Sequence, residues 1–200
     1  MRGLLAAAGG LRQGVAWVAA VMAHLAGWNY LACALFITFD IVARNFFGFS
    51  SRATVEVTGY MLACGIAWGL AHTLAARAHI RVDVLVNRFP VAVRAPLHLF
   101  ALLLLGVFAV FIAWAAYSLY DESALFDAHD NSALRIAMVV PQGIWLAGIL
   151  AFVVMVAVLL LESVLALLAG EPGRLDGLLA SRSVDDEAAE ALAAVKLAPR

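Results

Sequence analysis

The chain has 200 residues, of which 65% are hydrophobic and only 14% are charged, and its formal net charge at pH 7 is −1. Soluble domains average roughly 45–50% apolar and about 25% charged residues, so this composition, with a mean hydropathy of +0.96, excludes an ordinary soluble domain. We therefore expect an integral membrane protein.

The apolar residues form four long blocks along the chain. A helix of about 20 apolar residues, rising about 1.5 Å per residue, crosses a hydrocarbon core about 30 Å thick. The sequence thus predicts an all-α membrane protein whose transmembrane domain, 14–169, follows a short segment, 1–13, and precedes a flexible tail, 170–200. The expected spans are about 14–39, 53–76, 96–120 and 136–161.

Basic residues are distributed unevenly over the segments between these spans. Ten of the 13 Lys and Arg residues lie before the first span, between the second and third, or after the fourth. The positive-inside rule then places both termini and the loop 77–94 in the cytoplasm, and the acidic loop around Asp127 outside. Lys196 is the only lysine, so the chain has no polybasic patch and nucleic acid is not an expected partner.

The first span ends in a group of charged residues. Asp40 and Arg44 are four residues apart with the acid first, which is the favourable order for a helical ion pair. Glu56, one turn into the second span, either extends its carboxylate to the membrane surface or pairs with Arg44, Arg52 or a base of another subunit. We expect Asp40, Arg44 and Glu56 to take part in subunit contacts at the outer membrane boundary.

Small residues recur along the second span at four-residue spacing. Such residues let helix backbones approach closely where lipid supplies no hydrophobic drive for association. We expect this stripe to pack against neighbouring helices of the same chain or of a partner. The stripe contains Gly59, Ala63, Ala67, Ala71 and Ala75, and Gly69 closes a GxxxG pattern beside it.

The loop between the second and third spans contains an amphipathic segment. Val82, Leu85 and Phe89 fall on one helical face, and Pro90 ends the pattern. This pattern predicts a short cytoplasmic helix lying in the membrane interface. In the tail, either a weak helix over 184–195 or disorder is consistent with the sequence.

The spans contain few polar groups for chemistry. The chain has no HExxH, GxSxG, Walker or CxxC motif, so we expect neither an enzyme nor a metal site. One alternative remains open, a small membrane redox protein that binds haem b through His72 and His98, because both histidines fall near the inner ends of their spans.

Several short segments follow one another in a specific order along the chain: 40–47, Glu56, Gly69, 78–85 with His79 and Asp83, 89–90, and 139–145 with Pro141. Together they resemble the small membrane subunit, DctQ, of tripartite ATP-independent periplasmic (TRAP) transporters. The resemblance extends from about Leu31 to Leu161. In this chain Val55 precedes Glu56, where the family often has two adjacent acids.

The resemblance implies a non-catalytic subunit of a secondary transporter in the bacterial inner membrane. Such a subunit scaffolds the large transport subunit, to which a periplasmic binding protein delivers an organic acid for uptake by symport. Sodium commonly drives this uptake, and the substrate and ion sites belong to the large subunit. The resemblance therefore implies no cofactor in this chain, and its partners would be the large subunit, the binding protein and membrane lipid.

Overall fold

The computed structural model describes residues 2–78, 89–132, 134–180, 188 and 192. Its helices are α1 (Arg2–Phe47), α2 (Thr54–Ala75), α4 (Val91–Leu125), α5 (Val139–Leu168) and the short α6 (Pro172–Leu179). The first four of these are long and apolar enough to cross a membrane, which confirms the predicted all-α membrane fold. The predicted interfacial helix falls on residues 79–88, outside the described part of the chain.

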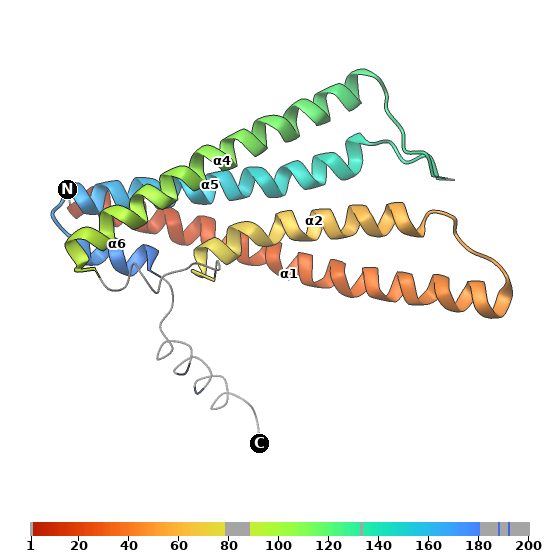
Figure 1. The fold of residues 1–200 in the computed structure, drawn as a ribbon, viewed down its shortest axis with the longest axis horizontal. Coiled ribbons are helices and arrows are strands. Elements are labelled where there is room, and N and C mark those ends of the chain that lie inside the picture. Colours follow the sequence, from red (N-terminus) through yellow and green to blue (C-terminus); the bar gives the residue numbers. More distant parts are fainter. Residues whose placement is uncertain (1, 79–88, 133, 181–187, 189–191, 193–200) are drawn as a thin grey trace.

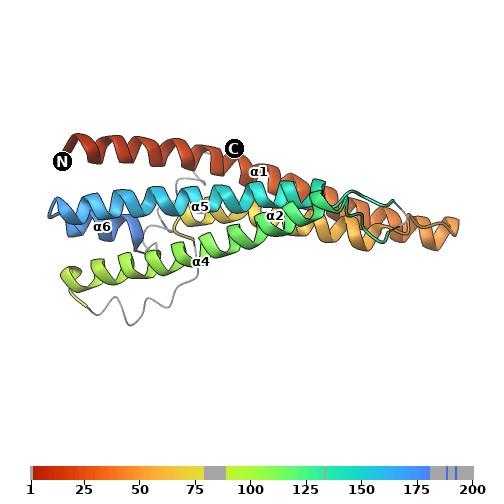
Figure 2. The same ribbon diagram turned by 90° about the horizontal axis from the view of Figure 1, so that it is seen from above.

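Helix α5 lies at the centre of the bundle. It packs against α1, α2, α4 and α6, whereas α4, among the described helices, contacts only α5 and α6 closely (Figures 1 and 2). In the most apolar stretch of α5, 44% of the residues are buried, against 17–22% in the other spans. The N-terminal part of α1 and α6 lie at one end of the bundle, here named the α6 end, and the turn 48–53 and loop 126–138 form the loop end (Figure 1).

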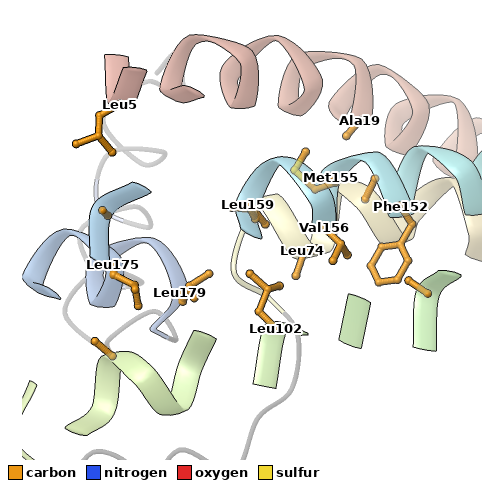
Figure 3. Close-up of a cluster of buried hydrophobic side chains, with 14 residues drawn as sticks. Leu5, Ala19, Leu74, Leu102, Phe152, Met155, Val156, Leu159, Leu175 and Leu179 are labelled. Carbon is orange, nitrogen blue, oxygen red and sulfur yellow. The ribbon is translucent and has the colours of Figure 1, made fainter. Parts of the chain in front are cut away.

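The hydrophobic core gathers around the second half of α5. Figure 3 shows Met155, Val156 and Leu159 of this helix beside Leu102 of α4 and Leu74 of α2. Each of these side chains is at most 4% exposed. Leu175 and Leu179 of α6 belong to the same core, which therefore continues beyond the spans to the α6 end.

Helix α1 is longer than any single span needs to be. Its 46 residues at about 1.5 Å each make a rod of about 69 Å, more than twice the thickness of the hydrocarbon core. Leu5 and Ala8 are buried, so the first residues pack against the bundle. Residues 2–13 of the segment that the sequence placed before the first span are therefore its continuous helical extension.

The chain reverses direction after α5 through a glycine. Gly170 has a φ of 72°, and its N–H donates to the Leu167 carbonyl while the Glu171 N–H donates to the Ala166 carbonyl. These two bonds form a Schellman motif, which ends a helix at a residue with positive φ. Pro172 then opens α6 at a position where its missing N–H is tolerated.

Helix α6 differs from the sequence expectation of a flexible tail. It is a short helix with two glycines, and helix propensity alone does not predict it. Leu175 and Leu179 are buried instead, so packing against α4 and α5 stabilises it. The helices also extend beyond the expected spans: α1 continues to Phe47, α4 begins before Pro96 and continues to Leu125, and α5 continues to Leu168. Most of the predicted helix over 184–195 lies outside the described residues.

The small-residue stripe of α2 divides into two parts. Ala67 and Ala71 are each 1% exposed, and α5 approaches there so closely that a Cβ on Gly148 would lie 2.8 Å from the carbonyl carbon of Ala67. Gly59 and Ala63, towards the loop end, are exposed. The expected close packing is therefore formed within the chain by one part of the stripe, and the other part is uncovered.

We expect Gly148→Ala to lower the free energy of unfolding by about 1–3 kcal/mol, because the added methyl group overpacks against the α2 backbone. Gly69→Ala is the matched control, since a Cβ at Gly69 meets no atom within 4 Å and alanine favours a helix by up to about 1 kcal/mol. Unfolding in detergent micelles by titration with sodium dodecyl sulfate measures both. Equal stability of the two variants would show that the contact at Gly148 is not close.

Candidate functional site

The α6 end contains a buried acid held between two arginines. Glu162 of α5 is 1% exposed, and Arg12 of α1 donates from Nε to its Oε2 at 2.8 Å. Arg174 of α6 donates to the other oxygen, Oε1, at 3.2 Å. A carboxylate removed from water needs such partners, because an isolated buried charge is strongly destabilising. Glu162 thereby joins α1, α5 and α6.

A second acid, Asp176 of α6, connects the same end to α4. The Arg94 guanidinium binds both of its carboxylate oxygens, with Nε 2.7 Å from Oδ1. The His98 Nε2 lies 3.8 Å from the same Oδ1. Arg77, just after α2, donates to the Gly177 carbonyl at 2.9 Å. Through these contacts α6 holds the ends of all four spans in one polar cluster, named here the α6 cluster.

Sequence patterns predicted only the basic residues of the α6 cluster. The uneven distribution of bases assigns Arg12, Arg77, Arg94 and Arg174 to one side of the membrane, and the structure brings them to one end of the bundle. The acids that join them were overlooked. The available signal was an acid, Glu162, directly after the predicted end of the fourth span, where its charge needs a partner.

Between the two ends, side chains join neighbouring helices through backbone carbonyls. Asn29 Nδ2 of α1 donates to the Met61 carbonyl of α2 at 2.6 Å, and Trp68 Nε1 of α2 donates to the Ile144 carbonyl of α5 at 2.8 Å. The Cys64 thiol lies 3.6 Å from the carbonyl oxygen of Pro141, one of the residues singled out by sequence, which is buried here. These polar side chains therefore hold the bundle together.

The charged residues at the loop end are not arranged as the sequence suggested. Asp40 is 6% exposed, and its carboxylate accepts hydrogen bonds from the Ser51 N–H at 3.0 Å and the Ser50 hydroxyl at 3.1 Å. The described residues contain no ion pair of Arg44 with Asp40 or Glu56, and Arg44 is exposed. The expected pair is absent because the turn after α1 folds back over Asp40 and supplies its donors.

Asp130 organises the loop 126–138 in a similar way. Its carboxylate accepts hydrogen bonds from the Ser132 hydroxyl at 2.9 Å, the Ile136 N–H at 3.0 Å and the Tyr60 hydroxyl of α2 at 3.3 Å. Burial alone would raise the pKa of this carboxyl, but the hydrogen bonds outweigh it and hold the pKa below its ordinary value. Asp130 is thus a buried structural residue of a loop that the sequence suggested to be solvated.

Two further sequence expectations concern histidines. His79 and Asp83 lie outside the described residues. His72 borders a groove between α1 and α2, whereas His98 lies beside Asp176 of α6, so the two imidazoles of the haem alternative have different surroundings. The described residues hold no group of three or more His, Cys, Asp or Glu side chains able to bind a metal ion. Neither these positions nor the comparisons below support haem binding.

A bundle of four apolar helices, each long enough to cross a membrane, defines a multi-pass helical membrane protein. Residues 33–169 match the family described as tripartite ATP-independent periplasmic transporters, DctQ component. The match covers more than half of the chain, so the protein belongs to this family and is a small membrane subunit of a TRAP transporter. A search of curated proteins finds no match to the chain.

We expect Glu162→Gln to destabilise the bundle, because it leaves two arginines without their charged partner. Breaking a fully buried pair costs about 3–5 kcal/mol, and the partial exposure of Arg12 and Arg174 lowers the expected loss to about 2 kcal/mol. The control is Glu171→Gln, whose carboxylate is 45% exposed and 4.0 Å from Arg174, with an expected loss below about 1 kcal/mol. Detergent unfolding measures both, and equal losses would contradict a structural role of Glu162.

We expect the loop 126–138 to lose its order in acid. Because the folded-state pKa of Asp130 is lowered, its ionised form stabilises the loop at neutral pH, and this contribution falls as the pH drops below the ordinary value of 3.8 and through the folded pKa. Asp130→Asn should remove this dependence and leave the Ser132 and Ile136 amides less protected at pH 7. Hydrogen exchange measures this, and unchanged protection would contradict it. Asp127→Asn is the control, since Asp127 is exposed.

Proposed function

We propose that the chain is the non-catalytic scaffold of its transporter, bound to the large transport subunit that moves the substrate. The match to the DctQ family carries this proposal. Two features of the bundle support it: the charges of the α6 cluster pair with each other, and the polar side chains between the helices bind backbone carbonyls. Both sets of groups bind partners within the bundle, so we expect the groups that bind the substrate to belong to the large subunit.

We infer that the substrate is an organic acid delivered by a periplasmic binding protein. The resemblance set out above supplies this expectation, together with sodium-driven symport and ion sites in the large subunit. The loop end, with the turn held by Asp40 and the loop held by Asp130, would then face the periplasm and form part of the surface where the binding protein docks. Its hydrogen bonds give such a surface a fixed shape.

Reconstitution into vesicles tests this function. The large subunit and the binding protein of the same transporter are purified, and uptake of labelled organic acids, such as succinate and pyruvate, is followed under an imposed sodium gradient. We expect uptake of one of them only when this chain is present with both partners. Full uptake without this chain would contradict the scaffold role, and uptake without the sodium gradient would contradict the coupling ion.

The proposed orientation puts the α6 end in the cytoplasm, where the excess of basic residues belongs. We expect a cysteine at Asn131, in the exposed part of the loop end, to react with an impermeant maleimide added to intact cells. A cysteine at Gly173, exposed in α6, should react only after the membrane is opened. Both variants are made in a chain whose Cys33 and Cys64 are replaced by serine. The reverse labelling pattern would invert the topology.

A further inference from the structure

Among the uncovered surfaces of the bundle, two faces differ clearly in their chemistry. Between Leu97 and Trp114, the exposed face of α4 consists of large apolar side chains, including Phe100, Leu104, Phe108 and Phe111, each at least 54% exposed. The only titratable side chain of this stretch, His98, is buried. Such a surface matches lipid acyl chains, which offer dispersion contacts and no hydrogen-bond partners.

The opposite face, between α1 and α2, has a groove of about 480 Å³. Small residues of α1, Ala23 and Gly27, lie along it, and a Cβ added to Gly27 would meet no atom within 4 Å. Trp28 and Leu31, 69% and 50% exposed, stand beside them. A row of small residues flanked by large ones is the surface into which another transmembrane helix packs closely.

Two imidazoles line the same groove, and they give it a polarity that lipid does not match. His24 lies about 15 Å along the helix from the start of the apolar stretch of α1. Its Nδ1 is 2.7 Å from the Ala20 carbonyl oxygen, which can only accept, so Nδ1 carries the proton and Nε2 of the neutral ring is an acceptor. The half-buried imidazole of His72 forms no hydrogen bond within the described residues. A polar group left in hydrocarbon without a partner is costly.

We propose that this α1–α2 groove is the face that binds a transmembrane helix of the large subunit, and that this helix carries a hydrogen-bond donor for His24 and a polar partner for His72. The proposal rests on the proposed function, since it names the surface through which the scaffold holds its partner. The α4 face then stays in contact with lipid. Helix packing into the groove and hydrogen bonds to the imidazoles act together, so binding depends on both Gly27 and the histidines.

Tryptophan quenching by brominated lipid separates the two faces. Two single-tryptophan chains keep either Trp28 in the groove or Trp114 on α4, and the other tryptophans are replaced by phenylalanine. Each is placed in vesicles of brominated phosphatidylcholine, alone and in complex with the large subunit. We expect lipid to quench both tryptophans in the isolated chain, and the complex to protect Trp28 at least about threefold while Trp114 stays quenched.

Protection of Trp114 in place of Trp28, or equal quenching of Trp28 in the complex, overturns the proposal. Protection of Trp28 without the large subunit overturns it too, because a second copy of the chain would then fill the groove. Failure of the parent chain to co-purify with the large subunit is a different result, since it overturns the proposed function itself.

Substitutions test the two contributions to binding separately. Gly27→Leu fills the groove, and His72→Leu removes an imidazole; we expect each to lower the amount of large subunit co-purified by about three- to tenfold. Ala115→Leu, on the exposed face of α4, is the matched control and should leave it unchanged. The unfolding of each isolated variant in detergent checks its fold. If correctly folded Gly27→Leu and His72→Leu chains bind as well as the control, the groove is not the interface.

Discussion

The bundle depends on how closely α5 is able to approach its neighbours. In a membrane, apolar side chains gain nothing by leaving lipid for one another, so helices associate through close packing and hydrogen bonds. Helix α5 packs against four helices. At Gly148 its backbone lies so close to Ala67 of α2 that no space is left for a methyl group. The position of α4 is set mainly by its contacts with α5, and that of α1 by its contacts with α2 and α5, and the groove and the lipid-facing surface follow from those positions.

Polar side chains in this bundle are used according to their depth. Near the middle, Asn29 and Trp68 donate to helix carbonyls and leave no charge in the hydrocarbon. Ionised groups meet at the α6 end, where Glu162 and Asp176 join the helices through arginines. The imidazoles of His24 and His72 differ from both groups because they face the outside of the bundle. That exception distinguishes the α1–α2 face from the rest of the surface.

Sequence patterns predicted what depends on composition and missed what depends on tertiary contacts. Long apolar blocks suffice to place four spans, because crossing a membrane requires length and hydrophobicity. Helix α6 was missed because Gly173 and Gly177 lower its propensity, and its stability comes from burial of Leu175 and Leu179. The spacing of Asp40 and Arg44 permits a pair, but spacing carries no information on the turn that supplies the Ser51 amide to Asp40.

The candidate site was also predictable only in part: patterns within one segment were visible in the sequence, and contacts between distant segments were not. The stripe of small residues on α2 was visible in the sequence, and its division into a covered and an uncovered part required the position of α5. The family resemblance, found on segments between Leu31 and Leu161, agrees with the match over residues 33–169. Glu162 was overlooked because its partners Arg12 and Arg174 lie 150 and 12 residues away, separations that no local pattern connects.

The separation between Arg12 and Glu162 also has a consequence for biosynthesis. At about 5–20 residues per second, a ribosome adds the 150 residues between them in about 8–30 s. Throughout this interval α1 is already made, and its arginine has no carboxylate from α5 to bind. Arg174 follows 12 residues after Glu162, so the acid obtains both partners only after all four spans have been made. Closure of the α6 end therefore follows the synthesis of all four spans, and a ribosome that stalls before α5 leaves α1 packed against α2 alone.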